Sequence, residues 1–391
     1  MKNLPNILFF CSADRYSGAE IVLERIIFGL IQKRVCNAFI LGTNEKFLEN
    51  VRGFEKNVYA LNNIKSLKGR KGRRSIIKFL IQIKSSSKQL KKFLNKNKID
   101  IIHANSIDSA IYALFQSNSK SIPLIWHHHN VLKRNSSDYF LAYLLSKKVK
   151  KIIAVSGAAL KSLPKKGQDK AEIIYNGVDV RNKFNPYSIN VDLIEDEYSN
   201  DNNDLMLGYV GQIHPSKGID IILDVLSELK KMSLNKRIFL NIAGKNDFGN
   251  EYYQFLLKKI KLLNIFEETK FLGHVDQIEF FYKKIDILIL PSVEPEAFPT
   301  VLLEASAMEK IVFSSNLGGG SEIIEEEING FLFEPKNKDQ LKEKILKIIK
   351  NIDLGKKIRA NARKNIIQKF DSEKQVECIY KIYDDVLRNG L

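Results

Sequence analysis

Short apolar runs alternate along the chain with longer stretches in which apolar residues recur every three or four positions. The short runs predict β-strands and the periodic stretches predict helices. In the first half the predicted strands are residues 6–10, 38–41, 99–103, 124–126, 152–155 and 172–175, and the predicted helices are residues 19–33, 75–94, 106–115 and 138–147. Strands that alternate with helices in this way favour a parallel sheet covered by helices on both faces.

The same alternation starts again after residue 204. The second set of predicted strands is residues 206–210, 238–243, 270–272, 287–290, 311–314 and 331–333. Residues 186–204 between the two sets are acidic and rich in Asn, so we interpret them as a hinge. The pattern predicts an α/β chain with Rossmann-like domains at residues 1–185 and 205–370, a linker at 186–204, and a last helix at 371–391 that packs back on the first domain. Two such domains place a cleft between the carboxyl ends of two sheets.

Length and composition agree with two folded domains. The 391 residues exceed one α/β domain of roughly 100–200 residues, and a hydrophobic share of 44% is enough for two cores. The three cysteines, Cys11, Cys36 and Cys378, are scattered and predict reduced thiols in a cytosolic protein. The apolar run at 7–10 is too short for a signal peptide or a spanning helix, so we expect a cytoplasmic protein that is at most peripheral to a membrane.

Charge is distributed unevenly along the chain. The formal net charge is +17, and residues 1–185 hold 34 Lys and Arg against 12 Asp and Glu. The segment Lys65–Lys98 alone holds 13 Lys and Arg, interleaved with apolar residues that fit roughly one helical face. Such a segment is typical of a helix that lies on anionic lipid, although it could instead pack its apolar side on its own domain. We therefore expect an anionic membrane surface as a partner.

Two glutamates mark the strongest chemical signal in the second half. Glu296 follows the predicted strand 287–290, and the carboxyl ends of such strands are the usual ligand side of a parallel sheet. Glu304 lies eight residues further on, among apolar residues of a predicted helix. A carboxylate there needs a hydrogen-bond partner. The hydroxyls of a ribose would serve, and so would a neighbouring helix; otherwise Glu304 would emerge at the surface.

Three loops contain glycines where a strand leads into a helix, which is how parallel sheets bind phosphates. Residues 211–218 carry Gly211, Gln212 and Lys217 between a predicted strand and helix, residues 317–322 carry Gly318 and Gly319, and Gly18 follows the helix cap Ser17. Taken alone, each loop could be an ordinary turn or, for the glycine triplet, a flexible connection. No Walker loop and no GxGxxG sequence is present.

Four of the six histidines lie at the ends of two predicted strands. His103 ends one strand, and His127, His128 and His129 end another. Because consecutive residues of a strand point to opposite faces, hydrogen bonding to a polar ligand is favoured over a metal site.

These motifs, in this order, make the chain resemble family 4 of the glycosyltransferases, which are retaining enzymes of GT-B architecture. The resemblance covers nearly the whole chain. Its most specific parts are the loop 211–218, the pair Glu296 and Glu304, and the sequence Gly318-Gly319-x-x-Glu322.

The resemblance implies a role for each of these residues. Lys217 would hold the donor diphosphate, Glu304 the ribose, and Glu296 the transferred sugar with its developing positive charge. Gly318 and Gly319 would offer backbone groups, Gly18 would lie under the diphosphate, and His129, or else His128, would bind the donor sugar. The implied reaction moves a sugar from a nucleotide-sugar donor to a glycan or lipid-linked acceptor, with no cofactor and no metal.

The sequence departs from the family pattern at several positions. Gln212 stands where many relatives have Arg, so either Lys217 suffices for the diphosphate or Lys245 assists it. Pro299 and Glu309 replace common glycines, and we interpret Glu309 as structural drift. A non-transferase GT-B enzyme, such as a nucleotide-sugar epimerase or phosphorylase, is the main alternative. A nucleic-acid-binding protein would explain the charge but not the second half's loops, and the intact glutamate pair argues against an inactive lectin-like relative.

Overall fold

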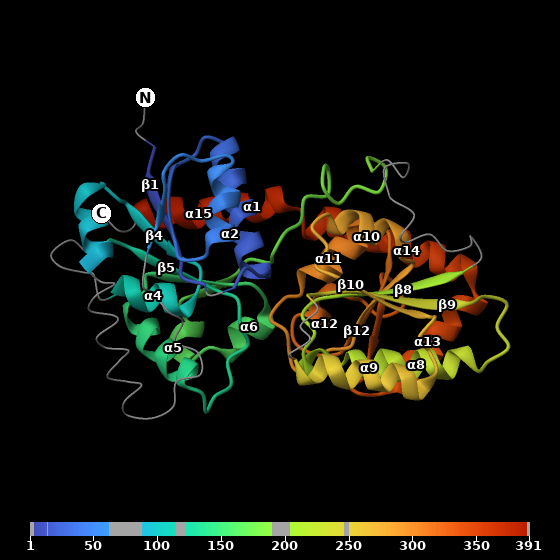
Figure 1. The fold of residues 1–391 in the computed structure, drawn as a ribbon. Helices are drawn as coiled ribbons and strands as arrows, with labels where there is room; N and C mark the ends of the chain where they lie inside the picture. The colour runs from blue at the N-terminus through green and yellow to red at the C-terminus, as the bar shows by residue number, and fades with distance from the viewer. Residues whose placement is uncertain are drawn as a thin grey trace. The chain divides into compact units, whose positions relative to one another are not determined.

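The computed structural model describes residues 4–13, 15–61, 88–114, 122–189, 204–245 and 250–388. The chain divides into two compact units, which we call unit 1 (Met1–Asn176 and Ser372–Leu391) and unit 2 (Gly177–Asp371) (Figure 1). The boundary falls at Asn176, ahead of the boundary predicted at residue 185. Most of the basic segment Lys65–Lys98 lies outside the described residues.

Unit 1 is built on a seven-stranded parallel sheet with the strand order β3-β2-β1-β4-β5-β6-β7. Its strands are β1 (Asn6–Cys11), β2 (Asn37–Gly42), β3 (Val58–Ala60), β4 (Ile101–Ala104), β5 (Leu124–His128), β6 (Lys151–Ala154) and β7 (Ala171–Ile173). Its helices are α1 (Gly18–Gln32), α2 (Glu45–Arg52), α4 (Ile107–Leu114), α5 (Ser137–Lys148), α6 (Gly157–Ser162), α7 (Lys165–Gln168) and α15 (Ser372–Arg388), together with helical residues 88–96.

Two cores cover the two faces of this sheet, as the alternation of side chains along a strand requires. Leu8 and Phe10 of β1 point into a core shared with α4 and α5. Ile7 and Phe9 point into the opposite core, which contains residues of α1, α2 and the C-terminal helix α15. Helix α15 is therefore an integral part of unit 1 although it follows unit 2 in the sequence.

Unit 2 contains a six-stranded parallel sheet with the order β10-β9-β8-β11-β12-β13. Its strands are β8 (Leu205–Val210), β9 (Ile238–Ala243), β10 (Thr269–Gly273), β11 (Ile287–Leu290), β12 (Ile311–Ser315) and β13 (Phe331–Phe333). Its helices are η3 (Pro215–Lys217), α8 (Ile219–Lys230), α9 (Glu251–Leu263), α10 (Ile278–Lys284), α11 (Thr300–Ala307), α12 (Gly320–Ile323), α13 (Lys338–Lys350) and α14 (Ile352–Lys369). The two sheets confirm the predicted pair of Rossmann-like domains.

Each sheet has one point where the order of the strands reverses. In unit 1 this point lies between β1 and β4, and in unit 2 it lies between β8 and β11. The chain leaves the sheet in opposite directions on the two sides of such a point, so the loops at the carboxyl ends diverge and leave room for a ligand. The two reversal points locate the candidate site residues within each unit.

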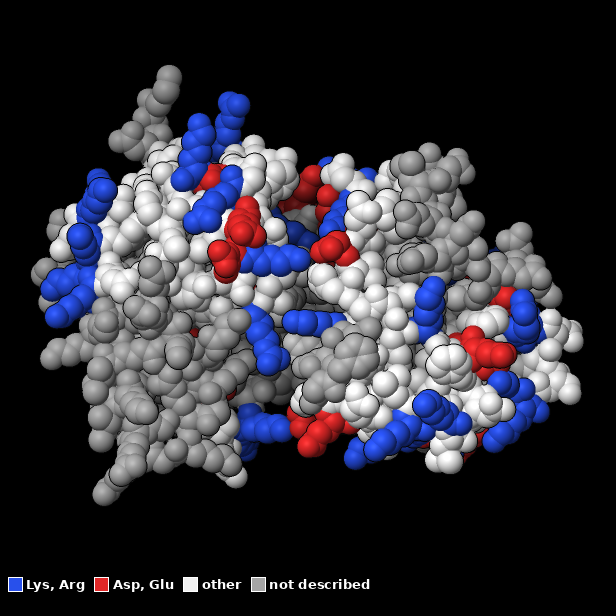
Figure 2. All heavy atoms as spheres, viewed as in Figure 1, with Lys and Arg blue, Asp and Glu red and all other residues white. Residues whose placement is uncertain are grey.

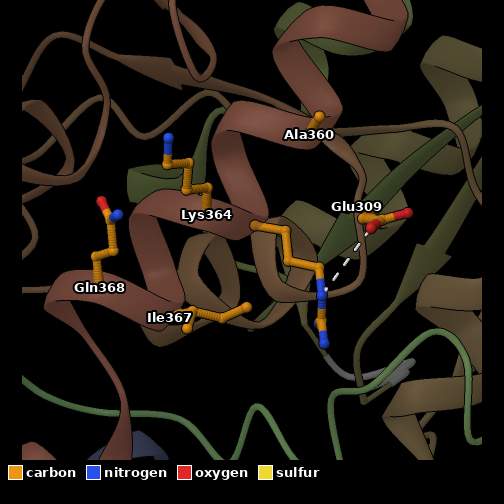
Figure 3. A pocket seen from close by; sticks show the side chains of 6 residues that line it. Glu309, Ala360, Lys364, Ile367 and Gln368 are labelled. Carbon is orange, nitrogen blue, oxygen red and sulfur yellow. Dashed lines mark ion pairs between the residues drawn. The ribbon is translucent and has the colours of Figure 1, made fainter.

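Within unit 2, Arg363 of α14 binds the segment 177–189 to the rest of the unit. The guanidinium donates from Nη1 to the carbonyls of Phe184, at 3.2 Å, and Ala307. It also lies 3.9 Å from the carboxylate of Glu309, which accepts a hydrogen bond from the Tyr187 hydroxyl. Figure 3 shows the ion-paired side chain of Glu309 at a pocket of about 320 Å³, which is lined by Glu309, Ala360, Arg363, Lys364, Ile367 and Gln368.

Glu309 itself adopts a left-handed conformation, with φ of 57°. Glycine adopts this conformation without strain, whereas other residues rarely do. Its carboxylate accepts a hydrogen bond from Tyr187 and pairs with Arg363. The interpretation of Glu309 as structural drift stays a prediction.

Candidate active site

Lys217 and Glu296 meet at the strand reversal of unit 2. Lys217 ends η3 after β8, and Glu296 lies in the loop between β11 and α11. Lys217 Nζ lies 2.8 Å from Glu296 Oε2, and Ser292 Oγ donates a hydrogen bond to Glu296 Oε1. Both carboxylate oxygens are thus occupied, and the only partner with a full positive charge in this set is Lys217. The side chains of Lys217 and Glu296 are 21% and 23% exposed, so each remains accessible to a ligand.

The loop 211–218 is shaped by two glycines in unusual conformations. Gly211 has φ of 152° and Gly218 has φ of 65°. A Cβ atom on Gly218 would lie 2.3 Å from the carbonyl oxygen of Pro291, so only glycine fits between this loop and the loop that carries Glu296. The backbone N–H of Val293 also donates to Ser216 O at 2.9 Å. The two loops are therefore held together by their backbones before any side chain contributes.

Gln212 takes part in this loop through its backbone. Its carbonyl accepts a hydrogen bond of 2.8 Å from the buried Tyr209 hydroxyl, and its side chain is exposed. Burial, followed by the charge of Glu296, raises the pKa of Tyr209 well above its usual value. Tyr209 therefore stays a neutral donor, and sequence reasoning did not identify it because it lies within a buried apolar strand.

The loop that follows β12 packs directly against the Glu296 loop. A Cβ atom on Gly318 would lie 2.2 Å from Glu296 O, and one on Gly319 would lie 2.0 Å from Ala297 O. The N–H of Gly319 donates to Glu296 O at 2.8 Å. That N–H is therefore engaged within the protein, and the two glycines are needed for close packing whatever else they do. The alternative of an open, flexible connection does not describe this loop.

Glu304 lies on the buried side of α11, where only 6% of the residue is exposed. Its Oε2 accepts a hydrogen bond of 3.1 Å from the hydroxyl of Tyr282 on α10. A hydrogen bond to a neighbouring helix was the alternative to ribose binding in the sequence analysis. Binding of a ribose by Glu304 stays a prediction.

In unit 1 a polar cluster lies at the carboxyl ends of β1 and β4, where that strand order reverses. Ser109 Oγ accepts from the backbone N–H of Ser12 at 2.8 Å and lies 2.9 Å from Ser12 Oγ. Asn105 follows β4 and donates to the carbonyl of Ala19 in α1 at 3.1 Å. Asn105, Ser12 and Ser109 were not predicted as site residues. For Ser12 and Asn105 the available signal was a polar residue directly after a buried strand, whereas Ser109 lies within α4.

Gly18 is the first residue of α1 and is exposed. Glu20 accepts hydrogen bonds from the N–H and the hydroxyl of Ser17, at 2.9 and 2.6 Å, which confirms the predicted helix cap. The role of Gly18 under a diphosphate stays a prediction.

The three consecutive histidines have different surroundings. His127 is fully buried, and its Nδ1 lies 3.2 Å from His103 Nε2. His128 is 1% exposed and lies 3.4 Å from the Ser162 hydroxyl. His129 alone is partly exposed, and its Nε2 lies 2.9 Å from Asn105 Oδ1. Exposure therefore favours His129 over His128 as a ligand-binding residue.

All four of these histidines are neutral near pH 7. Burial lowers the pKa of His103, His128 and His129 to about 3, and lowers that of His127 well below its usual value. Because Asn105 Oδ1 is an acceptor, the hydrogen bond of His129 assigns the proton to Nε2. A neutral His129 can exchange hydrogen bonds with sugar hydroxyls but adds no positive charge. Within the described residues, no group of three His, Cys, Asp or Glu is arranged to hold a metal ion.

Comparison with protein families covers both units. Residues 17–182 match the model of the family described as Glycosyltransferase Family 4, and residues 190–365 match that of Glycosyl transferases group 1. The chain belongs to glycosyltransferase family 4. An uncharacterized glycosyltransferase of Methanocaldococcus jannaschii is 29% identical over 85% of this chain and 88% of its own length.

Two further relatives of this glycosyltransferase extend the comparison. The UDP-Gal:alpha-D-GlcNAc-diphosphoundecaprenol alpha-1,3-galactosyltransferase of Escherichia coli is 24% identical over 79% of this chain and 81% of its own. The crystal structure of Anabaena HepE in complex with UDP and glucose superimposes with a TM-score of 0.80 at 22% identity, covering 97% of this chain and 99% of that one. The fold is therefore of the GT-B class.

Proposed function

We propose that this glycosyltransferase is a retaining enzyme that moves a sugar from a nucleotide-sugar donor to a glycan or lipid-linked acceptor, in the biosynthesis of cell-surface polysaccharide or lipopolysaccharide. The observation that carries the proposal is the pairing of Lys217 and Glu296 at the strand reversal of unit 2. The Escherichia coli relative, which is named as a galactosyltransferase acting on a lipid diphosphate, supports this class of acceptor.

In the proposed reaction, the bond between the anomeric carbon and the donor phosphate breaks. The acceptor oxygen bonds to that carbon from the same face, and its proton passes to the departing diphosphate. Lys217 and the N-terminus of α8 stabilise the departing diphosphate, which needs no metal ion. Glu296 stabilises the oxocarbenium-like carbon. Glu304 binds the ribose, while His129 supplies neutral hydrogen bonds to the donor sugar. Gly18, Gly211, Gln212, Gly318 and Gly319 shape the donor site.

We further propose that the enzyme works at an anionic membrane surface through the basic segment Lys65–Lys98. Among the described residues no helix is long and apolar enough to cross a bilayer. Charge reversal in Arg70–Arg74 tests this segment, because it should release the protein from anionic vesicles at low salt. Binding that survives the reversal would contradict a role for the segment.

The proposed reaction is tested in two steps. A thermal-shift screen across UDP-, GDP- and ADP-sugars first identifies the donor, since a ligand that binds the folded state raises the melting temperature. NMR of the product then reads the anomeric configuration with and without acceptor. Retention with acceptor dependence supports the proposal, and inversion contradicts it. An altered sugar formed without acceptor would show an epimerase instead.

A further inference from the structure

Helix α5 of unit 1 carries apolar side chains on its outward face. Phe140 is 61% exposed, Tyr143 38% and Leu144 42%. Their spacing of three and four residues places them side by side on one face of the helix. The opposite face already contributes Ala142 and Leu145 to the core of unit 1. Core packing therefore does not explain the outward residues, and an exposed apolar ridge of this kind marks a contact surface.

Lysines surround this ridge. Lys147 Nζ lies 4.2 Å from the centre of the Tyr143 ring, and its hydrogen bond and charge, with the charge of Lys166, lower the pKa of Tyr143. Lys166 belongs to α7, which lies against α5: a Cβ atom on Gly167 would be 2.7 Å from Ser146 Oγ. Burial, then the charges of Lys150 and Lys166, lower the pKa of Lys170. Several ammonium groups thus lie close enough together to repel one another.

Acidic neighbours do little to offset this charge. Asp169 lies 3.9 Å from Lys165, so its charge is shared with a lysine of its own helix. Asp138 lies in the first turn of α5, where a carboxylate stabilises the helix dipole. On the face drawn in Figure 2, the basic side chains at the left edge stand apart from acidic ones, whereas acidic and basic side chains mix over the rest of the face.

The chemistry of the surface selects its occupant. A partner must bury Phe140, Tyr143 and Leu144 and also supply negative charge to the lysines beside them. A bilayer with anionic headgroups offers both at once, because amphipathic side chains enter the boundary between headgroups and acyl chains while lysines remain at the phosphates. The basic segment Lys65–Lys98 of the same chain is a poor occupant, because its charge has the same sign.

We propose that the outward face of α5, formed by Phe140, Tyr143 and Leu144 and bordered by Lys147 and Lys166, docks on an anionic lipid bilayer. This face is distinct from the segment Lys65–Lys98. Its binding to lipid requires no donor and no acceptor, so it can be measured whether or not the proposed reaction is correct.

The experiment is co-sedimentation of the full chain with vesicles of phosphatidylglycerol and phosphatidylcholine, or of phosphatidylcholine alone. Phe140→Ser with Leu144→Ser should weaken binding to the anionic vesicles at least tenfold. Lys147→Glu with Lys166→Glu should weaken it more, because each lysine near an anionic surface contributes about fivefold and reversal doubles the effect. Added salt should weaken binding of the wild type to the anionic vesicles. It should not change binding of the wild type to vesicles of phosphatidylcholine alone.

Matched controls come from α9 of unit 2. Leu262 is 85% exposed and Phe266, just beyond the helix, is 71% exposed, so Leu262→Ser with Phe266→Ser removes a comparable apolar pair. Lys258→Glu with Lys261→Glu reverses two exposed lysines. Both control variants should bind vesicles as the wild type does. Thermal melting of all variants checks that they fold.

A direct probe places the face in the lipid. Phe140→Trp should show a blue-shifted emission with anionic vesicles and quenching by brominated acyl chains, over the background of the buried Trp126. The proposal is overturned if the wild type does not bind, if the α5 variants bind as well as the controls, or if the new tryptophan is not quenched. Loss of oligonucleotide binding in the α5 variants, with vesicle binding intact, would show a nucleic-acid surface instead.

Discussion

The sharpest prediction concerns Lys217, which pairs with Glu296 and is also proposed to bind the donor diphosphate. In the free enzyme its ammonium group lies 2.8 Å from Glu296 Oε2, and the same group is proposed to hold the donor diphosphate. A charge-assisted hydrogen bond of this type contributes about 1.5–3 kcal/mol. Partial exposure of both side chains reduces that figure through screening, so about 1.4 kcal/mol, a tenfold change in affinity, is a reasonable expectation.

Glu296→Gln keeps the shape of the side chain and removes the competing charge. We therefore expect a nucleoside diphosphate to bind about tenfold more tightly to this variant, and sugar transfer to fall by at least about a hundredfold because the developing cation loses its carboxylate. Lys217→Ala should weaken binding of the diphosphate and leave binding of the nucleoside unchanged. Glu294→Gln, in the same loop, is the charge-matched control and should change neither binding nor transfer.

Isothermal titration calorimetry of a nucleoside diphosphate and its nucleoside at one ionic strength measures these effects. The decisive sample is the double variant, because Glu296→Gln acts through Lys217 and should add nothing once Lys217 is Ala. If Glu296→Gln tightens binding equally in the Lys217→Ala background, the gain comes from the general field of the site. If Glu296→Gln does not tighten binding of the diphosphate at all, Glu296 and the diphosphate do not compete for Lys217, and the reasoning fails.

Three further predictions concern the scaffold. Gly319→Ala should lower both stability, by about 1–3 kcal/mol, and turnover, because its Cβ would lie 2.0 Å from Ala297 O and displace the Glu296 loop; unchanged kinetics would contradict the packing role. Glu309→Ala should cost about 1–2 kcal/mol more in urea unfolding than Glu309→Gly, because only glycine relieves a φ of 57°; equal costs would show an unstrained backbone. Between pH 6.5 and 5, unit 1 should lose stability as the pH falls. The histidine pKa values are lowered in the folded state, so each of the four binds its proton only after unfolding, at about 1.4 kcal/mol per pH unit. Burial raises the pKa of Glu24 to about 7 and also raises the pKa of Glu20, and these two carboxyl groups offset part of that slope. Urea titration followed by Trp126 fluorescence measures it, and a flat profile would contradict it.

The alternation of apolar runs and helical periods predicted the strands that build the two sheets. In unit 1 it missed β3, α2, α6 and α7, which are short elements of three, eight, six and four residues. Strand order was also hidden, since the reversal between β8 and β11 depends on which strands pair. Without that order, the sequence could place Lys217 and Glu296 at carboxyl ends but could not predict their contact.

Packing decided the residues whose roles the sequence left open. A glycine triplet is compatible with mobility or with ligand binding. Only the structure shows that it is a packing site, because a Cβ atom added to Gly319 or Gly318 would lie 2.0 or 2.2 Å from a carbonyl oxygen of the Glu296 loop. The hydrogen bond of Glu309 could not be predicted from the sequence, because its partner Tyr187 lies 122 residues away. Contacts between residues so far apart form only in the completed fold, so local sequence patterns cannot predict them.

The histidines show that burial determines the charge of a side chain, which composition alone does not reveal. Three consecutive histidines in a chain of net charge +17 suggest further positive charge for an anionic donor. Their neutral state removes that option, because an imidazole with a pKa of about 3 is uncharged at any physiological pH. In unit 2, Lys217 is the cation that pairs with Glu296, and Gln212 is uncharged at a position where the family pattern described above often has Arg. If the proposed reaction depends on Lys217 and on the backbone at the start of α8, without help from Lys245, exchanging Lys217 for a neutral residue should cost this enzyme more than it would cost a relative that carries both cations.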